Sequence, residues 1–263
     1  MEKHKELYSI NEIDGVTSIS SPHKKELKEI GERKAKTFRT LTEEQLKNAT
    51  KNIIGGTLEN IGLNEDWTIT KVFFPNVKIH TIYFYYGDEF GSKEIDQLKF
   101  LFSGERIRWI PGEDLANFID IMMNYAERMI IKKEPFKSRK EKQSEMLKNA
   151  IEERSPSFYF IINEDIPNIA ELIGGNFIKH KDFWELNKEI FPGITIRIKY
   201  TEKHELIPLI LGVKSDMLEN YEKDLLRILT INHILRYITI KYDKRDLPEV
   251  CKKMFAPGYL KQK

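Results

Sequence analysis

The amino-acid sequence predicts an α+β protein built from two tandem copies of one unit, in which a helix, several strands and a long helix surround mostly antiparallel sheets. The pattern Trp-x-x-x-Lys-x-x-Phe-Pro occurs at 67–75 and again at 184–192, which is 117 positions later. Each copy of the pattern is followed by a run that alternates β-branched or aromatic residues at period two, as strands do. Each is preceded by a Gly-Gly pair, at 55–56 and at 174–175. The pattern recurs at 117 positions and the glycine pairs at 119, and ordered features at a nearly constant separation indicate an internal repeat.

The first copy is predicted to span residues 42–131. Thr42 and Gln45 form a capping box that starts a helix over 42–54, and the glycine pair after it is typical of a helix C-terminus. A second helix is predicted to start at Pro111-Gly112, because the apolar residues after this point recur at helical spacing. Strands are therefore predicted at 67–74, 77–85, 97–102 and 106–110, and a long helix is predicted through 131.

The second copy is predicted to span residues 156–241. Asp165 caps a short helix, and the strand 194–200 follows the repeated pattern. A further strand is predicted at 157–162, with no counterpart in the first copy. The helix predicted over 216–240 carries a wide apolar stripe, which favours a position between the two copies.

Basic segments flank the two copies. We predict a basic helical arm over 1–41, a basic helical connector over 132–155 and a basic tail over 242–263. Residues 24–39 and 132–148 each hold seven basic and three acidic side chains, although the whole chain carries a formal charge of only +2. Such segments can meet phosphate or an acidic protein, whereas the interleaved acidic residues favour a solvated helix face.

Composition excludes several classes of protein. A single cysteine, Cys251, excludes an intramolecular disulfide framework and any site with several cysteine ligands. No apolar run reaches the ~20 residues of a membrane span, and the N-terminal residues do not resemble a secretory signal. The histidines lack metal-site spacing, and no phosphate-binding or nucleophile motif is present. We therefore expect a globular, cytoplasmic protein without a membrane span, whose cofactor, if it uses one, the sequence does not identify.

The candidate ligand site lies in the first copy. On the predicted strand 106–110, Arg106 and Arg108 share one face, beside the positive end of the following helix, and this arrangement suits a carboxylate or a phosphate. The second copy has no such arginines. Acidic pairs in a turn and at the helix start can converge with them, or the arginines can form surface ion pairs with the helix-start acids. The predicted ligand-binding residues are Asp88, Glu89, Arg106, Arg108, Trp109, Glu113 and Asp114.

A stretch over about 70–120 contains four signatures: a strand bounded by Pro75, Tyr86-Gly-Asp-Glu-Phe90, Lys99-Phe-Leu-Phe102 and Ile110-Pro-Gly-Glu-Asp-Leu-Ala116. This succession resembles a domain family of unknown function from anaerobic bacteria and archaea. The chain departs from the family at Gly112, where the family usually has Thr, and the second copy lacks the acidic turn. The resemblance implies a related fold and a place in anaerobic, corrinoid-linked metabolism, and it implies no reaction.

Three functions remain open at this point. The favoured hypothesis is a non-catalytic accessory or adaptor protein that binds a partner protein or a small anionic ligand, with no catalytic residues. One alternative is a hydrolase or metal-assisted enzyme, since paired carboxylates can act as acid and base or hold a cation. Its residues would be Asp88, Glu89, Glu113 and Asp114. The other alternative is a nucleic-acid-binding protein that uses the basic segments 24–39 and 132–148.

Overall fold

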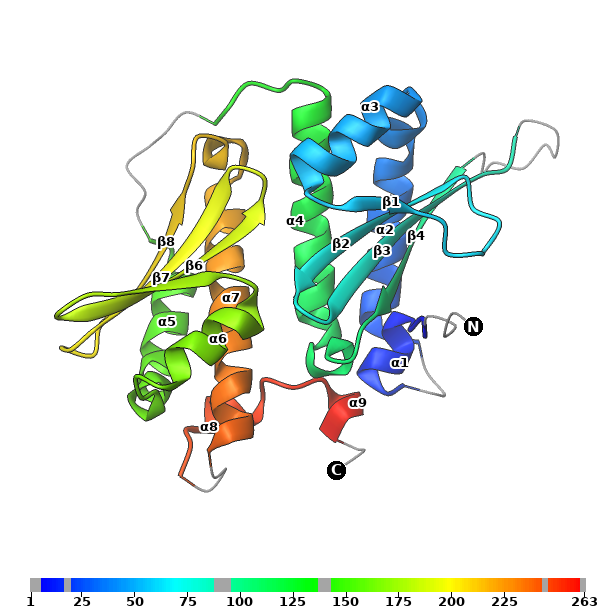
Figure 1. Ribbon diagram of the computed structural model, residues 1–263. Coiled ribbons are helices and arrows are strands. Elements are labelled where there is room, and N and C mark those ends of the chain that lie inside the picture. The colour runs from blue at the N-terminus through cyan, green and yellow to red at the C-terminus, as the bar shows by residue number, and fades with distance from the viewer. Residues whose placement is uncertain (1–5, 17–19, 88–95, 137–142, 243–245, 261–263) are drawn as a thin grey trace. The chain divides into compact units, whose positions relative to one another are not determined.

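The computed structural model describes residues 6–16, 20–87, 96–136, 143–242 and 246–260 (Figure 1). Within these ranges the strands form two four-stranded antiparallel sheets accompanied by helices, so the predicted α+β class is confirmed. The chain divides into two compact units. Unit 1 comprises Met1–Lys133 with Ala256–Lys263, and unit 2 comprises Glu134–Phe255. Among the described residues, no helix combines the length and the apolarity needed to cross a lipid bilayer.

Unit 1 has the sheet order β1-β2-β3-β4, with helices packed on one face. The Phe118 ring on the helix Gly112–Ile130 stacks on the Phe73 ring of the sheet, with ring centroids 3.8 Å apart. The Phe38 ring on the helix Pro22–Arg39 has its centroid 5.8 Å from that of the Trp67 ring. The elements are α1 (Ile10–Asp14), α2 (Pro22–Arg39), α3 (Glu43–Asn48), the π-helix η1 (Ala49–Ile54), β1 (Thr57–Glu59), β2 (Trp67–Phe74), β3 (Val77–Tyr85), β4 (Asp96–Ser103), the 3₁₀-helix η2 (Ile107–Trp109), α4 (Gly112–Ile130) and α9 (Pro257–Leu260).

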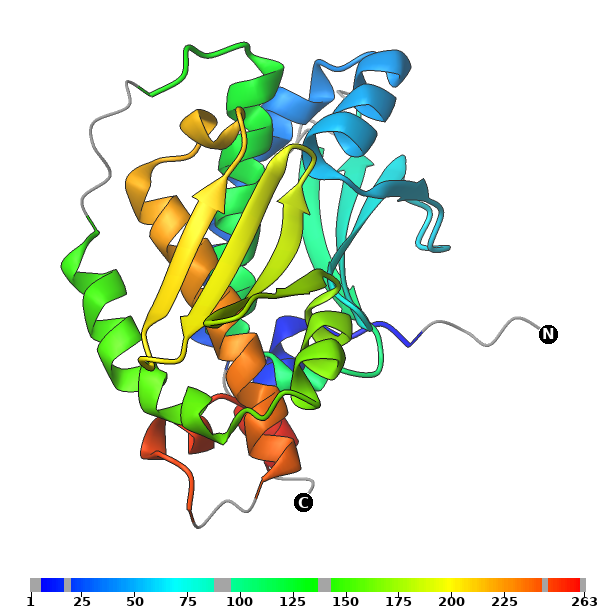
Figure 2. The ribbon, with the colours of Figure 1, turned by 60° about the vertical axis from the view of Figure 1, so that its left-hand side comes forward.

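Unit 2 repeats this layout with the sheet order β5-β6-β7-β8, and Figure 2 shows this sheet lying across α7. Phe158, fully buried, packs against the rings of Trp184 and Tyr200. The elements are α5 (Glu145–Arg154), the 3₁₀-helix η3 (Ser155–Phe160), α6 (Asp165–Ile173), β5 (Asn176–Lys179), β6 (Phe183–Phe191), β7 (Ile194–Thr201), β8 (Leu206–Leu211), the 3₁₀-helix η4 (Ser215–Met217), α7 (Asn220–Lys241) and α8 (Glu249–Lys252).

The register of the two central hairpins is the same after a shift of 117 residues. Trp67 pairs with Tyr83 in unit 1, and Trp184 pairs with Tyr200 in unit 2. Each hairpin also has one irregularity at the equivalent place, between Val72 and Phe74 and between Glu189 and Phe191. The two sheets therefore share a residue-by-residue layout, and their descent from one duplicated unit stays a prediction.

Two predicted strands are wrong. Residues 106–110 lie in and around η2, where Ile110 N–H donates to Ile107 O at i→i+3 spacing. Gly104, at φ 111°, turns the chain out of β4 before this point, so Arg106 and Arg108 do not share a strand face. Most of the predicted strand 157–162 is instead part of the 3₁₀-helix η3. A proline in the first turn of η3 favours this helical start. The glycine-ended helices before each sheet are confirmed, with left-handed glycines at both C-termini.

The flanking basic segments pack onto the units. In the predicted arm, α2 buries Leu27, Ile30 and Phe38, and its Lys34 Nζ lies 2.5 Å from Glu127 Oε2 of α4. In the predicted connector, α5 packs against α7, while residues 137–142 lie outside the described part of the chain. The predicted tail contributes α8 to unit 2 and α9 to unit 1.

Candidate functional site

The arginines of the predicted first-copy site both face aromatic rings. The Arg108 guanidinium carbon lies 4.6 Å from the centroid of the Tyr8 ring, and that of Arg106 lies 5.4 Å from the Trp109 ring. Trp109 in turn faces Tyr259 of α9, with ring centroids 6.2 Å apart. These contacts join η2 to the segment before α1 and to α9 in unit 1, and Arg106, Arg108 and Trp109 are all half-buried. The arrangement is typical of cation–π packing.

The start of α4, predicted to receive an anion, is capped by a carboxylate of the chain itself. Asp14 Oδ1 accepts the Gly112 backbone N–H at 3.0 Å, and Asp14 also accepts a hydrogen bond from the Ser21 hydroxyl. A Cβ atom at position 112 would lie 2.4 Å from Asp14 Oδ1, so a larger residue there would displace the Asp14 carboxylate. Glu113 is exposed and Asp114 half-buried in the same first turn. Because Asp14 lies 98 residues from Gly112, no local pattern could reveal this cap.

Replacing Asp14 by Ala should therefore lower the free energy of unfolding of unit 1 by about 1–2 kcal/mol, the typical effect of losing a helix cap. Chemical denaturation followed by circular dichroism measures the change. Glu113→Ala is the matched control, because it removes an exposed negative charge from the same helical turn without removing a cap, and should cost under about 0.5 kcal/mol. Equal losses in the two variants would contradict the capping role.

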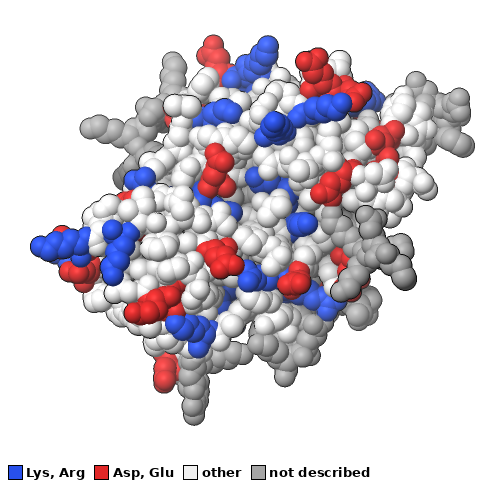
Figure 3. Space-filling view, viewed as in Figure 1, with Lys and Arg blue, Asp and Glu red and all other residues white. Residues whose placement is uncertain are grey.

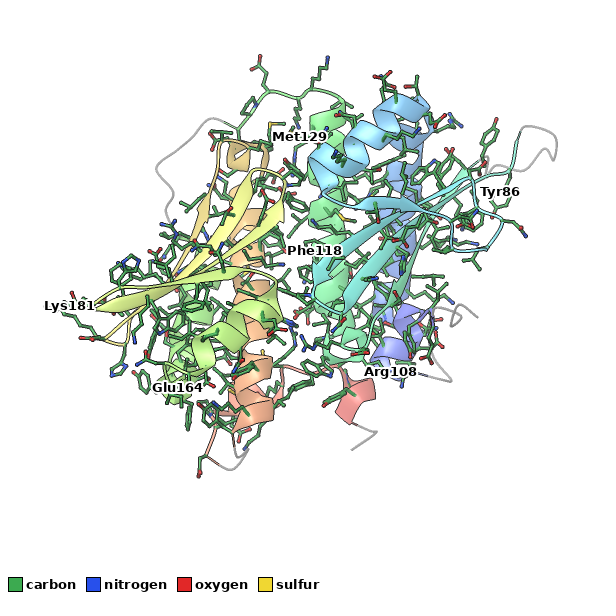
Figure 4. The ribbon with its side chains drawn as sticks, in the orientation of Figure 1. Tyr86, Arg108, Phe118, Met129, Glu164 and Lys181 are labelled. Carbon is green, nitrogen blue, oxygen red and sulfur yellow. The ribbon has the colours of Figure 1, made fainter. Side chains whose placement is uncertain are left out.

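The predicted acidic turn cannot be placed, because Asp88 and Glu89 lie outside the described residues. The residues just before them are at one end of the sheet, since Tyr85 pairs with Asp96, the first residue of β4. The chain reaches Arg106 from Ser103, the last residue of β4, and at ~3.3 Å per residue the two ends of β4 are about 23 Å apart. Figure 4 accordingly shows Tyr86 and Arg108 at opposite ends of unit 1.

Unit 2 contains a pocket that the sequence did not reveal. Its volume is about 400 Å³, and it lies where the β5–β6 turn, the β7–β8 turn and the segment before α6 meet. Lys181, labelled in Figure 4, is at the tip of the β5–β6 hairpin. The described lining residues are Asn163, Lys179, His180, Lys181, Phe183, Trp184, Tyr200, Thr201, Glu202 and His204.

Aromatic rings form the inner wall of this pocket. Trp184 and Tyr200 pair across β6 and β7 with ring centroids 5.5 Å apart, and both side chains are buried. Nearer the mouth, the His180 ring stacks on Phe183 with centroids 4.1 Å apart. Lys199 Nζ, on the neighbouring strand β7, lies 3.8 Å from the centroid of the Phe183 ring. The wall thus offers flat apolar surface with cations at its border.

A tight turn presents the second histidine. His204 has φ 63°, a left-handed conformation that is uncommon for non-glycine residues and that marks functional sites more often than chance. Thr201 fixes the turn, because its hydroxyl accepts the Glu205 N–H at 3.1 Å. His204 Nδ1 lies 3.0 Å from the Tyr200 hydroxyl. Burial raises the pKa of Tyr200, so the hydroxyl stays protonated at neutral pH and can donate to the imidazole.

The rim of the pocket is polar and mainly basic. Lys179 and Lys181 are exposed there, and Glu202 is the single carboxylate among the described lining residues. No group of three His, Cys, Asp or Glu side chains within the described ranges could hold a metal ion. The described lining thus places basic side chains beside the aromatic wall, together with the two histidines and Glu202.

The equivalent end of unit 1 has a different polarity. There Tyr83, the counterpart of Tyr200, donates from its hydroxyl to Asp96 at 3.5 Å, and burial raises its pKa to about 12. Asp66, next to Trp67, accepts the Tyr85 N–H at 2.6 Å. The Trp–Tyr pair is thus common to both units, whereas its polar neighbours differ: Asp66 and the Arg39–Asp96 ion pair in unit 1, and Lys179, Lys181 and Glu202 in unit 2. This contrast, visible only after the repeats are aligned, is the one sequence signal for the pocket.

A comparison of the chain with models of protein families, with curated proteins and with solved structures found no match.

Proposed function

We propose that this is a non-catalytic accessory protein whose unit 2 pocket binds a small anionic ligand with a flat, apolar part. The observation that carries the proposal is the combination of an aromatic wall and a basic rim in a cavity of about 400 Å³. Pockets for small ligands are typically apolar concavities of ~300–1,000 Å³ with a few converging polar groups. Trp184 and Tyr200 provide the apolar surface in this pocket, and Lys179 and Lys181 provide the charge.

The pocket has two kinds of surface, and each would contact a different part of the ligand. A carboxylate or phosphate would accept hydrogen bonds from the rim lysines, which are stronger than neutral ones because both partners are charged. A ring or planar apolar group would lie on the buried Trp184–Tyr200 wall, where aromatic contact adds to the burial of apolar area. Among the described residues, no specific contact favours the hydrolase or the nucleic-acid alternative; Asp88, Glu89 and residues 137–142 lie outside them. Corrinoid-linked metabolism stays a prediction.

Binding can be tested with aromatic anions. We expect at least one of benzoate, phenyl phosphate and adenosine monophosphate to raise the melting temperature of the wild-type protein and to change its tryptophan fluorescence. The double variant Lys179→Ala/Lys181→Ala should weaken the affinity about 10-fold or more, because it removes two charge-assisted contacts. Isothermal titration calorimetry measures the dissociation constants.

The control is Lys148→Ala/Lys252→Ala, which removes the same charge from exposed positions on α5 and α8. It should leave the affinity within about 2-fold, since exposed charges outside a site contribute little. Trp184→Phe should abolish the fluorescence response and keep part of the affinity. The proposal fails if none of the three anions binds the wild-type protein, or if the two double variants lose affinity equally.

A further inference from the structure

We propose that unit 1 has a second binding site, a groove at the free edge of β4 that takes an extended acidic peptide segment of a partner protein. The groove has a volume of about 350 Å³ and lies in a different unit from the aromatic pocket. It is bounded by the N-terminal residues around α1, by the first half of α2 and by β4. Its described lining residues are Ser9, Ile10, Asn11, Lys24, Leu27, Lys28, Gln97, Leu98, Lys99, Phe100 and Leu101.

The backbone of β4 already accepts a short strand addition beside this groove. β4 is the last strand of its sheet, and Tyr8 pairs with Phe102 across the free edge through two hydrogen bonds of 2.8 and 2.9 Å. Alternate residues of a strand direct their N–H and C=O groups to the same side. The backbone groups of Phe100 therefore point the same way as those of Phe102. The N-terminal segment does not continue this ladder, because it turns into α1 at Ile10.

At its other end the groove is closed by α2. Gly31 packs so closely on β4 that a Cβ atom at this position would lie 2.4 Å from the Leu98 carbonyl oxygen. The groove opens at the edge of β4 around Phe100, between the part of the edge paired with Tyr8 and the part covered by Gly31. An extended peptide laid there would pair with the strand edge, the mode of recognition known as β-strand addition.

The side chains around the groove select an acidic and partly apolar peptide. Its base is formed by Ile10, Leu27 and Phe100, all buried, which suits an apolar side chain at alternate positions of a peptide. The rim has three lysines and, among the described lining residues, no acidic one. The rim lysines are Lys24, Lys28 and Lys99.

These lysines are accessible to a partner. Lys28 contacts Glu32 at 3.5 Å, but that pair is exposed on both sides and contributes little. Lys99 Nζ lies 4.9 Å from the Phe84 ring centroid, and its side chain remains exposed. Edge pairing with Phe100 requires peptide N–H and C=O groups, so the site suits a peptide better than a nucleic acid, whose backbone offers no such ladder.

The test uses a fluorescently labelled peptide of eight residues that alternates Glu and Val. Fluorescence polarisation should show binding to the full-length protein, and Lys24→Glu/Lys28→Glu should weaken it about 10-fold or more, because two rim charges are reversed. The control Lys25→Glu/Lys36→Glu makes the same charge change at exposed positions of the same helix that do not line the groove. It should alter the affinity by no more than about 3-fold. Circular dichroism checks that both variants are folded.

Strand addition is tested separately on the wild-type protein. The same peptide with N-methyl groups on alternate backbone nitrogens cannot pair with an edge strand and should bind about 10-fold more weakly or worse. A Lys–Val peptide should not bind. The proposal is overturned if the methylated peptide binds equally well, if both charge variants lose affinity equally, or if a single-stranded oligonucleotide binds with the same dependence on Lys24 and Lys28. None of these results bears on Trp184 fluorescence, so the unit 2 pocket is judged independently.

Discussion

Replacing Asp165 by Asn should lower the free energy of unfolding of unit 2 by about 3 kcal/mol, the range seen when one partner of a buried charged network is removed. Asp165 is fully buried at the start of α6. Its carboxylate accepts four hydrogen bonds, three of which join α6 to the end of α7. The donors are the Tyr237 hydroxyl, the Tyr242 hydroxyl, Lys241 Nζ and the Ile162 N–H.

Asn cannot replace the carboxylate in this network. It is neutral and has one acceptor oxygen, so its amide nitrogen would face either the Tyr237 hydroxyl or the Ile162 N–H, both of which now donate to Asp165. At least one of these donors then loses its acceptor on the buried side chain of residue 165. Urea denaturation followed by Trp184 fluorescence, in a background with Trp67 and Trp109 replaced by Phe, reports on unit 2 because Trp184 is its single tryptophan.

The effect should depend on pH. Burial alone would raise the pKa of Asp165, but the hydrogen bonds from Lys241, Tyr242 and Tyr237 outweigh it and hold the pKa below its ordinary value of 3.8. A carboxyl whose pKa is lower in the folded state stabilises that state above its unfolded pKa, and this contribution is lost as the pH falls through the folded pKa. The difference between wild type and Asp165→Asn should therefore be constant near neutral pH and shrink below about pH 4.

Asp246→Asn, at an exposed position of the same unit, is the control and should change stability by less than about 0.5 kcal/mol. A loss for Asp165→Asn that is equally small, or that does not shrink in acid, would contradict the proposed role of the network.

The central hairpins could be predicted from sequence because their determinants are local. Period-two alternation fixes which residues of β2, β3, β6 and β7 share a face, and the repeat of Trp and Phe-Pro indicates the common register. Short segments were harder, since five or six apolar and aromatic residues can form a 3₁₀-helix as well as a strand. The run 106–110 shows this, because the turn at Gly104 decides its conformation.

The candidate site could not be predicted, because its residues come together only through tertiary structure. Asp14 caps a helix 98 residues away, and His180 and His204 reach one pocket from different hairpin turns. Basic composition alone does not identify a binding surface. Arg33 and Lys34 of the basic segment 24–39 pair with acidic residues of α4, and Figure 3 shows basic and acidic side chains interspersed over the surface in view.

Equivalent positions of the two sheets differ most where they are polar. His80 is buried in unit 1, with its ring nitrogens 2.8 Å from the Thr70 hydroxyl and 2.7 Å from the Ser103 hydroxyl. The residues 117 positions after Thr70 and His80 are Asn187 and Arg197, and there Arg197 Nε donates to Asn187 Oδ1 at 2.8 Å. A hydrogen-bonded pair across the hairpin is thus kept while its chemistry changes, as the contrast between the two Trp–Tyr ends also shows.

The shared layout leads to the second large effect, which should be equal in the two units. Gly56 and Gly175 follow the helix that precedes each sheet, and each packs against the neighbouring strand. A Cβ atom would lie 2.6 Å from the Thr70 carbonyl oxygen in the first case and 2.2 Å from that of Asn187 in the second. Gly56→Ala and Gly175→Ala should each lower the free energy of unfolding by about 2–3 kcal/mol, because a strand backbone must move to accept the methyl group.

The matched controls are Thr57→Ala and Asn176→Ala, at the adjacent exposed positions, and each should cost less than about 1 kcal/mol. Urea denaturation of all four variants measures the differences. Thr70 and Asn187 are 117 positions apart, whereas Gly56 and Gly175 are 119 apart, so unit 2 has two fewer residues between the glycine and the strand, and the contact is kept. If only one glycine proved sensitive, the helix–strand contact would not be a shared constraint, and the common layout would be limited to the hairpins.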